Sequence, residues 1–414
     1  MHKILVAAVA ACLVVVVLFS GCGGTTTGSS EASAGTDATT APAGTAAADS
    51  QGGQLTGDPI VIGAVVSTTG PNAPLGEPER MALELFEKQI NAAGGVLGRP
   101  LDVVVLDDQS NAKEAVTATQ RLLQQEKAVA VIGASGSAST LAMKAITAQA
   151  GIPQIAMAAS NNITSEPPSD WIWRVAPEDD LAVERAVSHV AEGLRVTKIA
   201  VLYDENAFGS SGLAQIEKVK DRYGIEVVAK ESYKTDETDL TAQLTKLKGS
   251  NPEALIVWGT NPGPAVAAKN LKQLAWDIPY VGSHGIANAK FIELAGEAAE
   301  GVTFPTTKIL FPESITDPEQ KALIEKLITD YTAEFGQAPN HFSSHGWDGI
   351  AVLVAAIEQA KSTEPAALQA ALNGLTDFTG ADGIFTYTAT DHDGLKVDDL
   401  IMVRVEGGKW ALAQ

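Results

Sequence analysis

The sequence predicts an α/β protein in which parallel sheets are covered by helices. Three observations lead to this fold class. Beyond Asp58, short β-branched runs alternate with longer helical segments. Most of the short runs are apolar throughout, as expected for strands that are buried on both faces. The alternation is interrupted near residues 175–177 and restarts at Lys198, which predicts two similar halves, each with its own sheet.

The predicted strands are short runs of apolar and β-branched residues. Eight are expected, at residues 60–66, 101–107, 128–132, 154–157, 198–203, 226–229, 254–258 and 279–281. Apolar residues at helical spacing predict helices at residues 76–93 and 112–125. Residues 312–375 are expected to be mainly helical, and residues 383–412 to form strands broken by Gly and Asp. The chain is therefore expected to pass between its halves more than once.

The N-terminus has the composition of a secretion signal. His2 and Lys3 precede an apolar run at residues 4–19, which ends in the small residues Ser20 and Gly21 before Cys22. The run is shorter than the roughly 20 residues that a membrane-spanning helix needs. Residues 1–21 are therefore predicted to be a signal peptide.

The end of this segment, residues 18–22, resembles a bacterial lipobox, although Phe19 stands where that motif usually has Leu. The resemblance implies that the thiol of Cys22 receives a lipid, which would anchor an extracytoplasmic protein to the cell membrane. Residues 23–57 are rich in Gly, Ser, Thr and Ala and are predicted to be a disordered tether. Residues 22–57 are thus expected to be a lipidated cysteine and its linker.

Charge and cysteine content exclude several classes of protein. The formal net charge of −21 argues against nucleic acid and anionic membrane surfaces as partners, because both require clustered Lys and Arg. The two cysteines, Cys12 and Cys22, both lie in the first 22 residues, so no disulfide framework is expected.

Several motifs after Asp58 resemble those of the type I periplasmic binding proteins, specifically the leucine/isoleucine/valine-binding branch. They lie at residues 62–64, 67–71, 90–100, 131–137, 203–209 and 291–302. The resemblance implies two Rossmann-like lobes joined by three hinge crossovers, with the ligand held in the cleft between them. The expected boundaries are residues 58–177 plus 306–382 for the first lobe and 178–305 plus 383–414 for the second.

The same resemblance implies the function. The chain is expected to be the extracytoplasmic binding component of an ABC importer, to act as a monomer, to dock on permease subunits, and to use no cofactor. A sensor that serves a separate signalling partner is an alternative, because fold does not determine function.

A run of small residues at 133–137 is the first candidate ligand site. It follows an apolar strand and precedes a helix expected to begin near Ser139, where free backbone N–H groups and the helix dipole favour an anion. The resemblance implies that Ser137 binds a ligand carboxylate, that Ser160 supplies a second hydroxyl, and that Ala158 offers its carbonyl. Ser135 and Gly136 complete this turn, which on its own could also be an ordinary helix cap.

Other candidate residues line the expected pocket. Leu75 and Phe208 stand where the family has residues that contact the ligand side chain, although either could be an exposed loop residue. Trp258 and Thr260 are expected to face Phe208, with plain core packing as the alternative for Trp258.

His284 stands where amino-acid binders of this branch usually have a glutamate that pairs with the ligand ammonium. An imidazole replaces that carboxylate poorly but can donate to a carboxylate, hydroxyl or carbonyl. Two ligand classes therefore stay open: a branched-chain or other hydrophobic amino acid, and an aromatic or other hydrophobic carboxylate without an amine.

Catalysis and metal binding are not predicted. The sequence has no nucleophile elbow, no HExxH motif, no P-loop, and no cysteine after Cys22. His341, His345 and Asp348 have a spacing compatible with a metal site on one helical face. Because His341 follows Pro339 and Asn340, we expect the two histidines to straddle a helix boundary and not to share a face.

Overall fold

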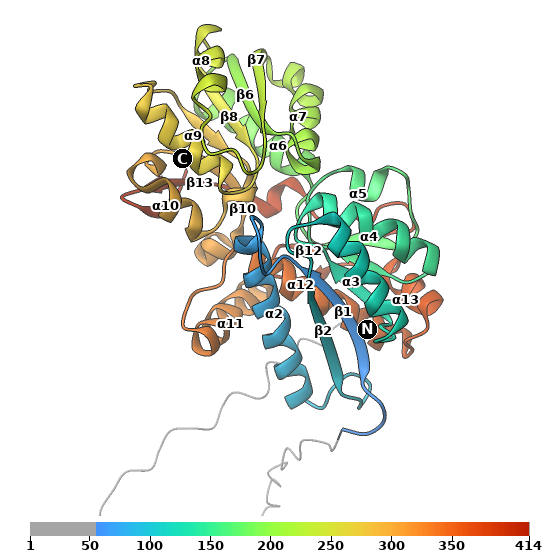
Figure 1. The fold of residues 1–414 in the computed structure, drawn as a ribbon. Coiled ribbons are helices and arrows are strands. Elements are labelled where there is room, and N and C mark those ends of the chain that lie inside the picture. Colours follow the sequence, from blue (N-terminus) through green and yellow to red (C-terminus); the bar gives the residue numbers. More distant parts are fainter. Residues whose placement is uncertain (1–54, 414) are drawn as a thin grey trace, which may run out of the picture.

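The computed structural model describes residues 55–413, which form two α/β lobes joined by crossover segments (Figure 1). The predicted signal peptide, Cys22 and residues 23–54 of the predicted linker lie outside the described residues. Among residues 55–413, no helix is both long enough and apolar enough to span a bilayer.

The first lobe contains a five-stranded parallel sheet in the order β2-β1-β3-β4-β5. Its strands are β1 (Ile60–Val66), β2 (Leu101–Asp107), β3 (Ala130–Gly133), β4 (Gln154–Ala156) and β5 (Ile172–Arg174). Covering helices come from both ends of the described chain: α2 (Ala73–Ala92), α3 (Ala112–Gln124), α4 (Ser137–Ala150), α5 (Asn162–Ser165), α11 (Pro318–Phe335), α12 (His341–Ala360) and α13 (Pro365–Leu372). Side chains of α2, α12 and α13 pack on one face of the sheet, and those of α3 and α4 pack on the other.

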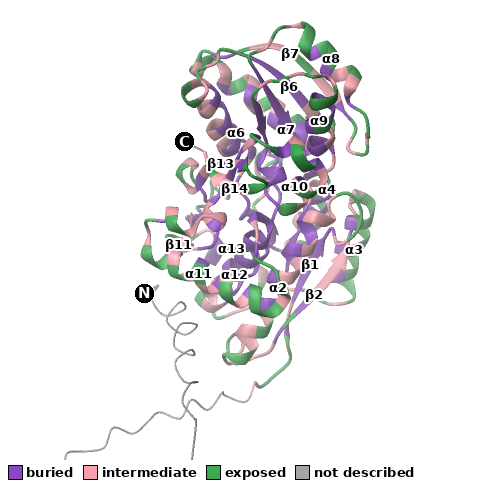
Figure 2. Cartoon of the chain, turned by 90° about the vertical axis from the view of Figure 1, so that its left-hand side faces the viewer, coloured by how far each residue is buried: buried purple, intermediate pink, exposed green. Residues whose placement is uncertain are grey.

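The second lobe contains a seven-stranded sheet in the order β14-β13-β10-β9-β8-β6-β7. Its strands are β6 (Lys198–Asp204), β7 (Glu226–Tyr233), β8 (Ala254–Trp258), β9 (Tyr280–Gly282), β10 (Thr303–Thr307), β13 (Leu400–Glu406) and β14 (Lys409–Leu412). Helices α6 (Asp179–Ser188) and α7 (Ala207–Val219) cover one face, while α8 (Thr241–Gly249), α9 (Gly263–Gln273) and α10 (Ala289–Ala295) cover the other. Buried residues fill the strands and the inner helices of both lobes (Figure 2).

Three passages join the lobes, which confirms the predicted fold class. The chain leaves the first sheet after β5, returns after β10, and crosses again between the short hairpin β11 (Phe378–Thr379) and β12 (Ile384–Phe385) and strand β13. The side chains of Phe385, Tyr387 and Leu395 pack in the core of the first lobe. The segment after residue 383, which we expected in the second lobe, therefore stays with the first lobe for about a dozen residues more.

All eight predicted strands are present, three of them with the predicted ends, and the strands β5, β10 and β11 were missed. Strand β5 has only three residues and includes the fully buried Arg174, so it lacks the usual apolar pattern. Strand β10 contains Pro305, which normally argues against a central strand. Its pairing with β9 is limited to Thr303 and Val281, while it pairs with β13 along its whole length, including Pro305 with Met402.

Candidate functional site

A cavity of about 340 Å³ lies between the two lobes. Its walls come from the segments that follow β1, β3, β4, β6, β7, β8 and β9, together with the start of α12. In open α/β sheets ligands bind outside the carboxyl ends of the strands, and here the carboxyl ends of both sheets border one cavity. Eight of the ten predicted binding residues line it: Leu75, Ser135, Gly136, Ser137, Ala158, Phe208, Thr260 and His284.

The N-terminus of α4 opens into this cavity. The helix begins at Ser137, two residues before the predicted start, and its N-cap residue Gly136 has no side chain to bond the first N–H groups. Ser137, Ala138 and Ser139 all line the cavity. The free N–H groups and the positive end of the helix dipole therefore favour an anion at this position.

Ser137 and Ser160 are neighbours, as expected. The backbone N–H of Ser160 donates to Ser137 Oγ at 3.3 Å. Ser160 itself is buried behind the wall and does not line the cavity, and its Oγ has no hydrogen-bond partner among the described residues. Buried hydroxyl groups normally have a hydrogen-bond partner. A small movement of the loop, or an atom of a bound ligand, would supply one to Ser160.

Ser135 supports the turn instead of facing a ligand freely. Its Oγ donates to the buried carboxyl group of Glu79 and accepts from the N–H of Ser67 at 2.9 Å. Burial raises the pKa of Glu79 well above its usual range. Ser135 thus links the loop after β3 to the loop after β1 and to helix α2.

A residue that sequence reasoning missed holds the second serine loop in place. Arg174 is fully buried, and its Nη1 donates to the carbonyls of Ala159 at 2.7 Å and Ser160 at 2.9 Å. The Ala158 carbonyl lies 3.5 Å from the same nitrogen, while Nε donates to Asp393 at 2.7 Å. In the sequence, Arg174 lies between the apolar residues 171–173 and 175–176, and this pattern was the signal for a buried charge.

The apolar wall is formed by Leu75 on α2 and Phe208 in the first turn of α7, where a loop was expected. Trp258 does not line the cavity. It is fully buried, its Nε1 donates to Asp179 at 3.1 Å, and its ring lies 6.1 Å from that of Phe208. Trp258 therefore supports the wall from behind, in agreement with the core alternative.

Contacts between the lobes close part of the cavity. The hydroxyl of Thr260 in the second lobe donates to Asn72 Oδ1 in the first at 3.4 Å. The N–H of Asn161 in the first lobe donates to Ser211 Oγ on α7 at 3.1 Å. The lobes thus touch at the cavity, through Thr260 and Asn72, and at a second point outside its lining, through Asn161 and Ser211.

His284 is buried, and neither of its ring nitrogens has a hydrogen-bond partner among the described residues. Burial, with a smaller contribution from the charge of Arg174, lowers the pKa of His284 to about 3. The imidazole is therefore neutral near pH 7 and offers one donor and one acceptor. Among the described cavity-lining residues the only carboxylate is Asp236, which is exposed in the segment after β7.

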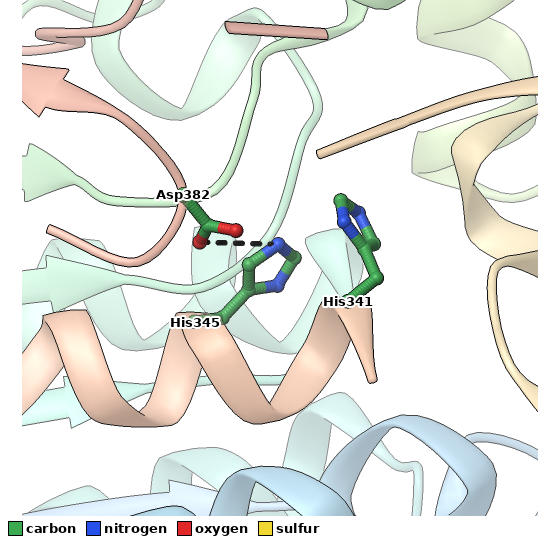
Figure 3. Close-up of side chains that lie close together, drawn as sticks. All are labelled: His341, His345 and Asp382. Atoms are coloured by element: carbon green, nitrogen blue, oxygen red, sulfur yellow. Dashed lines mark ion pairs between the residues drawn. The ribbon is translucent and has the colours of Figure 1, made fainter. Parts of the chain in front are cut away.

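The prediction that His341 and His345 straddle a helix boundary and do not share a face is wrong. Asn340 is the N-cap, accepting from the N–H groups of Phe342 and Ser343, so both His341 and His345 belong to α12. Their rings lie on the same face with centroids 4.4 Å apart (Figure 3). Asp348 does not join them, because its carboxylate accepts from two backbone N–H groups of the β11–β12 loop.

Asn72, Met157 and Phe342 are among the lining residues that were not predicted. Phe342 and His345 both line the cavity from α12 and are three residues apart, the spacing of one helical face. That spacing is visible in the sequence, but it indicates a cavity wall only because the structure places the start of α12 at the cavity.

The chain is similar to known binding proteins over most of its length. The model of a family described as periplasmic binding protein matches residues 59–409. A protein of Pseudomonas aeruginosa named amino acid binding protein is 28% identical over 312 residues, which are 74% of this chain and 80% of that protein. Another from the same organism, a leucine-, isoleucine-, valine-, threonine- and alanine-binding protein, is 27% identical over 78% of this chain and 84% of that protein.

A solved structure shares the fold closely. It is the substrate-binding protein of a branched-chain amino acid transporter from Streptococcus pneumoniae, in complex with isoleucine. The likeness has a TM-score of 0.77 at 26% identity, and it covers 86% of this chain and 99% of the other.

The role of Arg174 can be tested by replacing it with methionine. Arg174→Met should lower the free energy of unfolding by about 3–5 kcal/mol, because Asp393 and the carbonyls of Ala159 and Ser160 lose a buried cationic partner. The matched control is Arg121→Met, which breaks a pair with Glu126 near the surface and should cost less than about 1 kcal/mol. Urea denaturation measures both, and equal stabilities would contradict the assignment.

Proposed function

Because the chain belongs to the periplasmic binding protein family, we propose that it captures a branched-chain or other hydrophobic amino acid for an ABC importer. The observation that carries this proposal is that the α4 N-terminus and the apolar side chains of Leu75 and Phe208 line the same cavity. A carboxylate would accept hydrogen bonds from the N–H groups of the first turn and from Ser137. The ligand side chain would then contact Leu75, Met157 and Phe208.

The size of the cavity and the nature of the relatives support the same ligand class. A volume of about 340 Å³ lies at the lower end of the range for small-molecule sites, which fits a single amino acid. The Pseudomonas relatives are named for amino acids, and the Streptococcus protein holds isoleucine. Closure of the lobes would bury the ligand, and the contacts of Thr260 and Asn161 across the cleft would stabilise the closed form.

One observation favours a second ligand class, a hydrophobic carboxylate without an amine. An ammonium group buried in the cleft needs acceptors, and His284 is a neutral ring where a carboxylate would be the strongest partner. The carbonyl of Ala158 is partly engaged by Arg174, and the carboxylate of Asp236 is exposed, so neither replaces a buried carboxylate as partner of an ammonium. A ligand without an amine would leave no such group unpaired.

Membrane attachment through Cys22 is a further part of the proposal, supported by the lipobox-like residues 18–22. Replacing Cys22 with Ser should prevent lipid transfer, because the acceptor thiol is lost, and should move the protein from the membrane fraction to the soluble fraction. Fractionation of cells that express each form, with Cys12→Ser as control, measures this. Membrane retention of the Cys22 variant would contradict lipid anchoring.

The ligand class can be decided by thermal shift and calorimetry on the purified chain. Leucine, isoleucine and valine should raise the melting temperature, because a ligand that binds only the folded state stabilises it. A shift with benzoates or branched aliphatic acids, and none with amino acids, would establish the second class. Absence of a shift with both sets would contradict capture of a small hydrophobic carboxylate.

Whichever acid binds, Ser137→Ala should weaken its affinity by about 1–3 kcal/mol, the usual cost of losing a hydrogen bond to a charged group. Ser160→Ala should act in the same direction if its free hydroxyl turns toward the ligand. The control is Ser188→Ala, whose hydroxyl bonds only the carbonyl of Arg185 and lies outside the cavity. Unchanged affinity in both the Ser137 and Ser160 variants would contradict binding of the ligand carboxylate at this position.

A further inference from the structure

A group of three buried polar side chains lies on the first-lobe side of the cavity. His341, His345 and Asp382 are each at most 1% exposed. One possible ligand atom from each residue lies within 4.8 Å of the other two. Figure 3 shows the two imidazoles one turn apart on α12, with the carboxylate of Asp382 facing His345 from the β11–β12 loop.

In this cluster His341 and Asp382 each have one side-chain atom in a hydrogen bond and one without a partner among the described residues. In His341, Nδ1 lies 3.0 Å from Thr307 Oγ1, and Nε2 has no partner. Ser344 Oγ donates to Asp382 Oδ1 at 2.7 Å, while Oδ2 has no hydrogen bond and lies 3.6 Å from His345 Nε2. A histidine held through one nitrogen and open at the other is the usual arrangement of a metal ligand.

His345 completes the set. Neither ring nitrogen makes a hydrogen bond of normal geometry, although the backbone carbonyl of Met157 lies near enough to favour the protonated ring. Both rings therefore have at least one nitrogen without a hydrogen-bond partner among the described residues, which could face an ion.

Two buried carboxyl groups at the cluster have no basic partner. Asp348 and Asp382 are both fully buried, and among residues 55–413 no lysine or arginine forms an ion pair with either. A bound divalent ion would give the carboxyl group of Asp382 the cationic partner that the described residues do not supply.

We propose that His341, His345 and Asp382 bind a divalent transition-metal ion such as Zn²⁺. Two imidazoles and one carboxylate are a common three-residue ligand set for zinc, which leaves a fourth position for another group. Ligand atoms bound tetrahedrally at about 2.1 Å lie about 3.4 Å apart, so the ligand atoms, which lie within 4.8 Å of one another here, would have to approach by up to about 1.4 Å through side-chain rotation. The spacing of His341 and His345 on one face of α12 would then serve to hold the ion.

The position of the cluster links it to the cavity. His345 lines the cavity, and the ring of His341 lies 5.9 Å from that of His284 in the second lobe. The fourth position of the ion is therefore open to a ligand carboxylate or to His284. The three proposed metal ligands come from α12 and the β11–β12 loop, and not from the α4 N-terminus to which the ligand carboxylate is assigned.

The test is a Zn²⁺ titration of the chelator-treated chain by calorimetry, with metal content measured after dialysis. One ion per chain should bind with a Kd below about 10 µM and should raise the melting temperature. His345→Gln and Asp382→Asn should each weaken Zn²⁺ binding by about 100-fold or more, beyond the roughly 10–100-fold cost of losing an outer partner of a ligand. His189→Gln is the control, since that ring lies outside the cluster and should leave Zn²⁺ affinity unchanged.

Two results would overturn the proposal: no stoichiometric Zn²⁺ binding by the folded wild-type chain, or equal binding by wild type and both cluster variants. If a variant does not fold, the Co²⁺ form of the wild-type chain decides. A visible spectrum of four-coordinate Co²⁺ with nitrogen ligands supports the site, and the spectrum of hydrated Co²⁺ contradicts it. Both measurements are made without the cleft ligand, so failure of the amino-acid proposal cannot produce either result.

Discussion

The hydrogen bonds and the ion pair of the buried Arg174 guanidinium hold the loop at residues 158–160 in the wall of the cavity. The guanidinium engages the carbonyls of Ala159 and Ser160 and pairs with Asp393 in the crossover segment. The chain around it is also fixed, because Tyr387 Oη donates to the Arg174 carbonyl at 2.7 Å. A charge removed from water requires this full set of partners, so the wall loop and the crossover are held in one arrangement.

A row of rings connects the second lobe with α12. The rings of Phe208, Trp258 and His284 pack against one another with centroid separations of 5.3 to 6.1 Å, and the ring of His284 also lies 5.9 Å from that of His341. His284 stands at the boundary of the lobes, where it contacts the cavity, the aromatic wall and the proposed metal cluster. A change at this position would therefore alter ligand specificity and the contact between the lobes together.

Much of the fold follows from the sequence, since apolar runs such as residues 60–66 and 254–258 need burial on both faces. Strands β5 and β10 escaped prediction because Arg174 and Pro305 contradict the usual strand pattern and are tolerated only through tertiary partners. Serine positions in the turn after β3 were predictable from small residues before a helix. The nearness of Asp382 to His341 was not, because it depends on how the β11–β12 loop packs against α12, about 40 residues along the chain.

The central claim is that the N-terminus of α4 holds a ligand carboxylate beside an apolar wall. Calorimetry that compares one bound acid with its uncharged amide, such as leucine with leucinamide, tests this most directly because shape and side chain are nearly unchanged. The account predicts that the amide binds at least about 1.5 kcal/mol more weakly, the lower range for hydrogen bonds to a charged group. Equal affinity of acid and amide would contradict it.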